Sequence, residues 1–375
     1  MKISSKFDSG NIEVVDITDS NNIQLKIRKD SNAEFLQWFH FRLQGEKNKE
    51  YKLKIINAGE SSYADGWKDY KACASYDRQE WFRVPTEYDG KTLTITHTPE
   101  FESVYYSYFA PYSHERHLDL LGYAQQSKLT KVIDLGNTVD GRDINLVNIG
   151  LDDEIKKKIW IIARQHPGES MAEWFVDGLI KRLLDNHDPI SKALLKKASF
   201  YIVPNMNLDG SINGNLRSNA AGANLNREWM TPSIEKSPEV YYVREKMHEI
   251  GIDMFLDIHG DEAIPYNFVA TTEGIPSYND ELKNLEDSFV EHLIQVNPDF
   301  QNVHGYEKDR FGSANMTLAS NYIAEKFGCL ALTIEMPFKD NNNDPDEKYG
   351  WSSDRSMKLG ESALNSIYYM LDQLR

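Results

Sequence analysis

The chain has 375 residues, of which 40% are hydrophobic and 27% are charged, a composition typical of a globular protein with one or two domains. Its formal charge of −16 argues against a nucleic-acid binder and against a protein that binds anionic membranes. No apolar run is long enough for a secretion signal or a membrane span, and the two cysteines lie far apart, so a reducing, cytoplasmic location is expected.

The first part of the chain is expected to form an all-β sandwich domain over residues 1–115. Short segments rich in β-branched and aromatic residues are separated by turn clusters about every ten residues, which is typical of a sandwich. The predicted strands include residues 34–43, 51–59, 70–77 and 91–99. No amphipathic helix is predicted before about residue 115.

From about residue 118 the pattern changes, and residues 116–375 are expected to form an α/β domain. A hairpin is predicted over 131–150, turning at Asp140-Gly141, and the helical pattern is clearest over 170–186. Short apolar strands alternating with helices predict a mixed sheet between helical layers, an α/β/α arrangement. These strands are predicted at residues 159–163, 200–204, 254–258, 268–272 and 330–336.

Polar residues stand at the ends of three of these strands. His166 and Glu169 follow 159–163, His259 follows 254–258, and Glu335 ends 330–336. Open α/β sheets bind ligands at the carboxyl ends of their strands, so these side chains are expected to meet. Two imidazoles and two carboxylates fit a catalytic zinc with three protein ligands and one free acidic base. Asp257, two residues before His259, could orient an imidazole.

The spacing of these residues alone has almost no weight, because H-x-x-E occurs four times in the chain. Only the match at His166 combines a buried strand, a Pro-Gly turn and a following helix. The Gly/Asn-rich loop over 204–229 adds Arg217 and Arg227 as candidates for anion capture, since a guanidinium matches a carboxylate with two hydrogen bonds. A solvated loop with incidental charge is the alternative.

Together these motifs resemble the zinc metallocarboxypeptidases of the M14 family. The shared elements are HPGE at 166–169, the pattern N-x-D-G…R…G-x-x-L-N-R-x-W at 207–229, a strand ending in HG and a strand ending in TIE. Their order, and FAPY at 109–112, are similar to the cytosolic carboxypeptidase-like branch, which carries a β-sandwich before the catalytic domain.

The resemblance implies a fold, a cofactor and a role for each matching residue. The chain is expected to bind one Zn²⁺ and to hydrolyse the C-terminal peptide bond of peptides or proteins, with water activated by zinc and Glu335. The implied zinc ligands are His166, Glu169 and His259. Arg217 is expected to stabilise the oxyanion, and Asn226 with Arg227 to bind the substrate carboxylate. Tyr306 and Tyr322 both lie where the family has a tyrosine that closes on substrate.

Two other functions remain open on the sequence. A zinc deacylase acting on N-acyl amino acids would share the H-x-x-E…H ligands, and a binding module that has lost catalysis would share the fold. A peptide or protein C-terminus is the expected substrate, with no nucleic acid or membrane as partner, and a homo-oligomer is left open.

Overall fold

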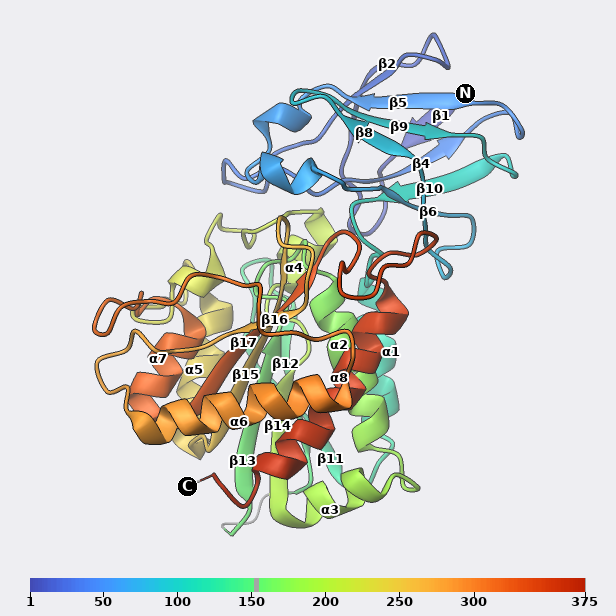
Figure 1. Cartoon of the computed structure of the whole chain (residues 1–375). Helices are drawn as coiled ribbons and strands as arrows, with labels where there is room; N and C mark the ends of the chain where they lie inside the picture. Colours follow the sequence, from blue (N-terminus) through green and yellow to red (C-terminus); the bar gives the residue numbers. More distant parts are fainter. Residues whose placement is uncertain (152–154, 375) are drawn as a thin grey trace.

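The computed structural model describes residues 1–151 and 155–374, and its N-terminal part consists of two five-stranded sheets (Figure 1). One sheet has the spatial order β1 (Lys2–Ser4), β4 (His40–Gln44), β10 (Ser103–Ser107), β6 (Cys73–Ser75) and β7 (Phe82–Arg83). The other has the order β2 (Glu13–Asp16), β3 (Ile23–Lys26), β5 (Tyr51–Ile55), β9 (Leu93–His97) and β8 (Thr86–Tyr88). Burial alternates along β5 and β9, as expected for strands with one face on a core.

The predicted strands of this part are longer than the observed ones. The stretch 34–43 forms a strand only from His40, and 70–77 only over Cys73–Ser75. Residues 36–39 are buried although they are not in a strand, so the aromatic pattern there reflects core packing rather than strand pairing. The chain before β4 instead reaches the C-terminal part, where Asn32 donates a hydrogen bond to the carbonyl of Ala220.

The C-terminal part is built on one seven-stranded mixed sheet, as the sequence predicts. Its four central strands are parallel and three antiparallel strands lie at the edges. The spatial order is β11 (Thr130–Asn137), β12 (Asp143–Ile149), β14 (Ala198–Val203), β13 (Lys157–Ala163), β15 (Met254–Asp261), β17 (Leu330–Pro337) and β16 (Phe268–Ala270). The predicted hairpin is present, and Gly141 in its turn has φ +82°.

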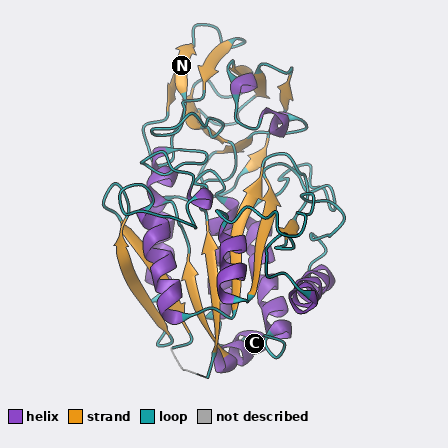
Figure 2. Ribbon diagram, turned by 90° about the vertical axis from the view of Figure 1, so that its left-hand side faces the viewer, coloured by secondary structure: helices purple, strands orange, loops and turns teal. Residues whose placement is uncertain are grey.

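Helices cover both faces of this sheet (Figures 1 and 2), which confirms the α/β/α prediction. In Figure 1, α1, α2 and α8 lie to the right of the sheet and α5 and α7 to its left. The helices are α1 (His114–Ala124), α2 (Met171–Leu183), α3 (Pro189–Lys197), α4 (Leu208–Asn213), α5 (Pro238–Ile250), α6 (Asp280–Val296), α7 (Ala319–Phe327) and α8 (Ser353–Met370). Among the described residues, no helix is long and apolar enough to cross a bilayer.

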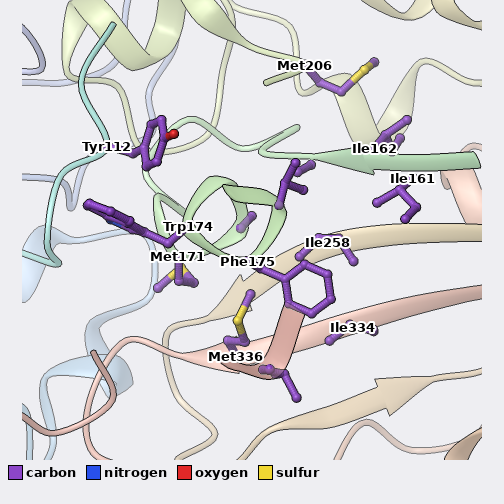
Figure 3. Packing of buried hydrophobic residues seen from close by; sticks show 14 of the residues in the cluster. Tyr112, Ile161, Ile162, Met171, Trp174, Phe175, Met206, Ile258, Ile334 and Met336 are labelled. Atoms are coloured by element: carbon purple, nitrogen blue, oxygen red, sulfur yellow. The ribbon is translucent and has the colours of Figure 1, made fainter. Parts of the chain in front are cut away.

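Helix α2 forms the centre of the core next to the site. Its apolar side faces the sheet, and Figure 3 shows Phe175 pointing toward Ile258, Ile334 and Met336 of β15 and β17. All four side chains are fully buried, so the helix that begins directly after Glu169 is fixed on the sheet.

Glycines allow α2 and α8 to lie in backbone contact. A Cβ added at Gly360 would lie 2.0 Å from the carbonyl oxygen of Phe175. We therefore expect Gly360→Ala to lower the free energy of unfolding by about 3 kcal/mol, because two backbones would have to separate. Gly122→Ala in α1 is the matched control: its Cβ would meet nothing within 4 Å, so the change should be neutral or stabilising. Urea unfolding measures both, and equal losses in the two variants would contradict the packing argument.

The two parts of the chain are joined through Arg83, which is nearly buried. Its Nη2 donates to the carbonyls of Phe338 (2.8 Å) and Trp351 (3.0 Å), and its Nε donates to that of Tyr349 (3.2 Å). The ring of Phe338 also stacks on Tyr108 at 4.4 Å. The β-sheet part therefore holds the segment that follows β17.

Candidate active site

The site lies where three parallel strands end. Strands β13, β15 and β17 are neighbours, and His259 is paired in register with Glu335. After β13 the chain turns at Arg164, whose φ is +60°, and residues 166–169 then lead into α2. This turn brings ligand atoms of His166, Glu169 and His259 within 4.8 Å of one another. The structure thus brings together the residues that the sequence predicts as metal ligands.

The two imidazoles present the same nitrogen to this centre. His166 Nδ1 lies 2.6 Å from Glu169 Oε1, His259 Nδ1 lies 2.8 Å from Glu169 Oε2, and the two Nδ1 atoms are 3.2 Å apart. On the outer side, His166 Nε2 lies 3.1 Å from Asn224 Oδ1 and His259 Nε2 lies 2.9 Å from Asp257 Oδ1. Asn224 Oδ1 also accepts the N–H of Asn226, which identifies that atom as the oxygen.

These outer partners determine which nitrogen carries the proton. Both Asn224 Oδ1 and a carboxylate of Asp257 only accept, so Nε2 of each imidazole can direct its proton outward. Burial opposes the shift, but the carboxylates of Asp257 and Glu169 raise the pKa of His259 well above its ordinary value, so a metal would displace a proton from His259 Nδ1. Burial, together with the charge of Arg217, lowers the pKa of His166 to about 4, which keeps that ring neutral. Once the His259 proton is displaced, two lone pairs and a carboxylate would face one another in a buried space, an arrangement that a divalent cation stabilises. The donor set therefore fits a metal such as zinc.

Asp257 is itself held in place by hydrogen bonds. Gln165 Nε2 donates to Asp257 Oδ2 at 2.7 Å, and Trp229 Nε1 donates to Gln165 Oε1 at 2.8 Å. Strand alternation puts Asp257 and His259 on the same face, as the sequence suggested. This series of side-chain contacts, from Trp229 through Gln165 and Asp257, fixes the orientation of the His259 imidazole.

Glu335 is the free acid of the site. Its side chain is buried, Oε1 lies 3.3 Å from the hydroxyl of Tyr306, and Oε2 has no hydrogen-bond partner among the residues that the structure describes. Burial raises the pKa of Glu335 well above its ordinary value; His259 opposes this shift and nearby carboxylates, including Glu169, add to it. A buried carboxyl with an unsatisfied oxygen next to a metal site is suited to accept a proton.

The structure distinguishes the two candidate tyrosines. The Tyr306 hydroxyl donates to Asp261 Oδ2 at 2.7 Å and its ring is half exposed at the mouth of the site. Tyr322 lies elsewhere, with its hydroxyl 3.1 Å from His248 Nε2. Only Tyr306 is therefore placed to contact a ligand at the metal centre.

A cleft of about 350 Å³ opens from the metal centre. Arg217, Asn226 and Arg227 line it together with His166, His259 and Glu335. The Asn226 oxygen accepts the N–H of Ala319 at 2.8 Å, which leaves its amide N–H groups for a ligand. The other lining residues are Val269, Ala270, Thr271, Glu273, Tyr306, Glu307, Lys308, Asp309, Leu318, Ser320, Asn321 and Thr333.

The guanidinium of Arg217 has an acidic neighbour, Glu262, and a basic one, Arg227. Burial raises the pKa of Glu262 to about 8, although Arg217 acts against that shift. Burial and the neighbouring Arg217 lower the pKa of Arg227. The guanidinium groups of Arg217 and Arg227 thus face the same cleft, beside the His/Glu/His cluster. Their positive electrostatic potential attracts an anionic group of a ligand.

A second buried carboxyl, Glu239 in α5, supports the loop that carries Arg217. Its Oε2 accepts a hydrogen bond from Asn219, and burial raises its pKa to about 7 from the ordinary 4.5. The folded protein therefore holds this proton more tightly than the unfolded chain does. The associated stability is fully present below about pH 4.5 and is lost as the pH rises to about 7.

We accordingly expect Glu239→Gln to be more stable than the parent protein at pH 8, by up to about 3 kcal/mol, and nearly equal to it at pH 4.5. Urea unfolding at the two pH values measures the difference. The matched control is Glu235→Gln at an exposed position, which should show no such dependence. A Glu239→Gln protein that is less stable at pH 8 would contradict the assignment.

Several residues of the site were not predicted from the sequence. Asn224 and Gln165 orient the imidazoles and stand directly next to predicted site residues, so the motifs could have indicated them. Asp261 and Glu262 follow His259 in the same way. Asp30 lies in the N-terminal part, yet its carboxylate accepts the backbone N–H of Arg217, and no sequence signal indicates that contact.

A mixed α/β sheet with a His/Glu/His cluster and a free buried carboxyl at its strand ends defines a metal-dependent hydrolase. Comparison with known families shows that residues 117–351 match the zinc carboxypeptidase family and residues 3–109 match the cytosolic carboxypeptidase N-terminal domain. The chain belongs to the zinc carboxypeptidase family. It is therefore a metallocarboxypeptidase, as the sequence motifs predicted.

Solved relatives share the whole fold. A metallo-carboxypeptidase from Burkholderia cenocepacia is 52% identical, with a TM-score of 0.97 over 99% of each chain. A metallo-carboxypeptidase from Pseudomonas aeruginosa, solved in complex with (2-guanidinoethylmercapto)succinic acid, is 46% identical, with a TM-score of 0.98 over 100% of each chain. Human cytosolic carboxypeptidase 1 is 30% identical over 290 residues, which cover 65% of this chain and 24% of that relative.

Proposed function

We propose that the chain binds one Zn²⁺ through His166, Glu169 and His259 and releases the C-terminal residue of peptides or proteins. The observation that carries this proposal is the shared strand edge: the three ligands and Glu335 meet at one end of a cleft whose wall carries Arg217 and Arg227. Neutral imidazoles and a carboxylate are the ligands that a catalytic zinc prefers.

In this proposal, the free C-terminal carboxylate of the substrate binds Asn226 and Arg227. The amide N–H groups of Asn226 and the guanidinium of Arg227 provide donors that match a carboxylate. Such recognition requires a free chain end, so the enzyme acts as an exopeptidase. Arg217 lies on the same wall and stabilises the oxygen of the scissile carbonyl as negative charge develops on it.

When bound, zinc supplies Lewis-acid chemistry, polarising a carbonyl and lowering the pKa of water. Glu335 accepts the proton of the attacking water on its unpartnered Oε2 and passes it to the departing amine. The C–N bond breaks, the new carboxyl gains the water oxygen, and the amine leaves with the proton. Tyr306 stands at the mouth of the cleft, where its hydroxyl would donate a hydrogen bond to the bound substrate.

The experiment compares three substrate classes on the zinc-loaded protein. We expect release of the last residue from peptides with a free C-terminus and none from the same peptides carrying a C-terminal amide. N-acyl amino acids test the alternative deacylase. Hydrolysis of these compounds with no activity on peptides would refute the proposal, as would a protein that neither binds zinc nor cleaves any substrate.

We also propose a domain boundary at 115/116 and a cytoplasmic location. The boundary is supported by the two family matches, which cover residues 3–109 and 117–351 and so leave it between 109 and 117. The location is supported by Cys73 and Cys329, which are both free and buried. The charge of −16 favours a peptide over a nucleic acid as partner.

A further inference from the structure

The loop that carries Arg217 is bonded to the N-terminal β-sheet part as well as to its own part of the chain. Three side chains of the N-terminal part bind the backbone of the loop: Asn11 Nδ2 donates to Gly214 O at 2.8 Å, Asn32 Nδ2 to Ala220 O at 2.8 Å, and Asp30 binds between them. Residues 214–220 are therefore hydrogen-bonded along their length to residues between 11 and 32, almost 200 positions earlier in the sequence.

Asp30 is the most heavily bonded of these residues. Its side chain is 5% exposed, and Oδ1 accepts the backbone N–H of Leu216 at 2.6 Å. Oδ2 accepts the backbone N–H groups of Arg217 (2.7 Å) and Ser218 (2.9 Å) and the hydroxyl of Ser218 (3.0 Å). Three consecutive N–H groups directed at one carboxylate fix the backbone torsions on both sides of Arg217.

The side chain of Arg217 is also held by the N-terminal part. Its guanidinium carbon lies 5.1 Å from the ring centre of Tyr63 and 6.0 Å from that of Phe35. Both rings precede residue 116, whereas the cleft that Arg217 lines belongs to the seven-stranded sheet. The backbone and the charged head of one cleft residue are thus both placed by the other part of the chain.

We propose that Asp30 is a positioning residue for catalysis: it sets the backbone of Arg217 so that the guanidinium meets the developing oxyanion. The inference rests on the proposed carboxypeptidase function. It assigns the β-sheet part a role inside the reaction rather than only at the rim of the cleft. Misplacing a stabilising group by about 1 Å is enough to lower turnover by roughly 10²-fold.

A purely structural role for Asp30 makes a different prediction. The parts stay joined without it, because Asn11, Asn32 and Arg83 each bridge them. If Asp30 only stabilised the interface, its loss would reduce the amount of folded enzyme but not the turnover of each folded molecule. A double-mutant cycle with Arg217 separates the two roles.

The test uses the full-length zinc-loaded enzyme and the variants Asp30→Asn, Arg217→Met and their combination. Asp30→Asn keeps the shape but turns N–H groups toward the backbone N–H donors of the loop. We expect it to lower kcat by roughly 10- to 100-fold with little change in KM and in zinc content. In the Arg217→Met background the same change should have no further effect on kcat.

The matched control is Asn32→Gly, which removes a hydrogen bond to the same loop at a residue with φ +53°, where glycine is permitted. It should keep kcat within about twofold. The inference would be overturned if the double variant lost kcat by the product of the two single losses. An Asn32→Gly enzyme as slow as Asp30→Asn would overturn it as well. If Asp30→Asn does not fold, Ser218→Ala replaces it in the double-mutant cycle, because it removes one of the four hydrogen-bond donors to the Asp30 carboxylate. A parent enzyme inactive on free-ended peptides would refute the proposed function instead.

Discussion

Replacing Glu335 by glutamine should lower kcat for a free-ended peptide by roughly 10²–10⁴-fold, the usual contribution of a positioned general base. The amide keeps the size of the side chain but cannot take a proton from water. Because Glu335 lies outside the His/Glu/His cluster, zinc content should stay at one ion per chain and KM should change little. Steady-state kinetics and metal analysis of the same preparation measure the three quantities.

The matched control is Glu87→Gln, the same change at an exposed position on β8 in the N-terminal part. It should retain full activity. Substantial turnover by Glu335→Gln would contradict the mechanism, whereas loss of zinc from that variant would place Glu335 among the ligands instead.

Removing the metal should have the second large effect, both on turnover and on stability. A chelator should abolish hydrolysis and lower the Tm, because the metal binds the folded state and stabilises it by about 4 kcal/mol at a thousandfold excess over its Kd. Without the ion, ligand atoms of His166, Glu169 and His259 still lie within 4.8 Å of one another and keep the folded state's metal site assembled. Thermal unfolding with and without added Zn²⁺ measures the shift.

Glu169→Gln provides the internal control for this experiment. It removes the anionic ligand, so the variant should be inactive and its Tm should no longer respond to chelator or to Zn²⁺. A Tm that responds to the metal equally in both proteins would show that the stabilising ion binds elsewhere, and activity that survives chelation would contradict a metal mechanism.

Much of the fold could be predicted because local pattern and long-range packing agree. The apolar runs of β13, β15 and β17 are buried on both faces, so their sequences clearly indicate strands. The polar residues at the ends of these runs, His166, His259 and Glu335, could therefore be identified from the sequence alone. Strand lengths in the N-terminal part were overestimated, since buried aromatic residues in an irregular backbone look the same in sequence as residues of a strand.

The rest of the site depends on contacts that no local pattern encodes. Tyr306 could not be chosen over Tyr322 because the loop before α7 has no regular periodicity, and only its folded path brings the Tyr306 hydroxyl to Glu335. Asp30 is similar: an acidic residue in a turn usually faces solvent, and its partners at Leu216–Ser218 are almost 200 positions away.

The junction made by Arg83 has a consequence for how this chain can diverge. Within the described part of the chain, the hydrogen bonds of the guanidinium all go to main-chain carbonyls, those of Phe338, Tyr349, Trp351 and, from its own side, Lys71. These hydrogen bonds do not depend on which side chains occupy 338–351, provided that the path of the backbone is kept, whereas the stack of Phe338 on Tyr108 does. Homologues should therefore vary in residue type at the exposed positions 342–345 while keeping the length of the stretch, because an insertion or deletion there would break the bonds that Arg83 makes to it.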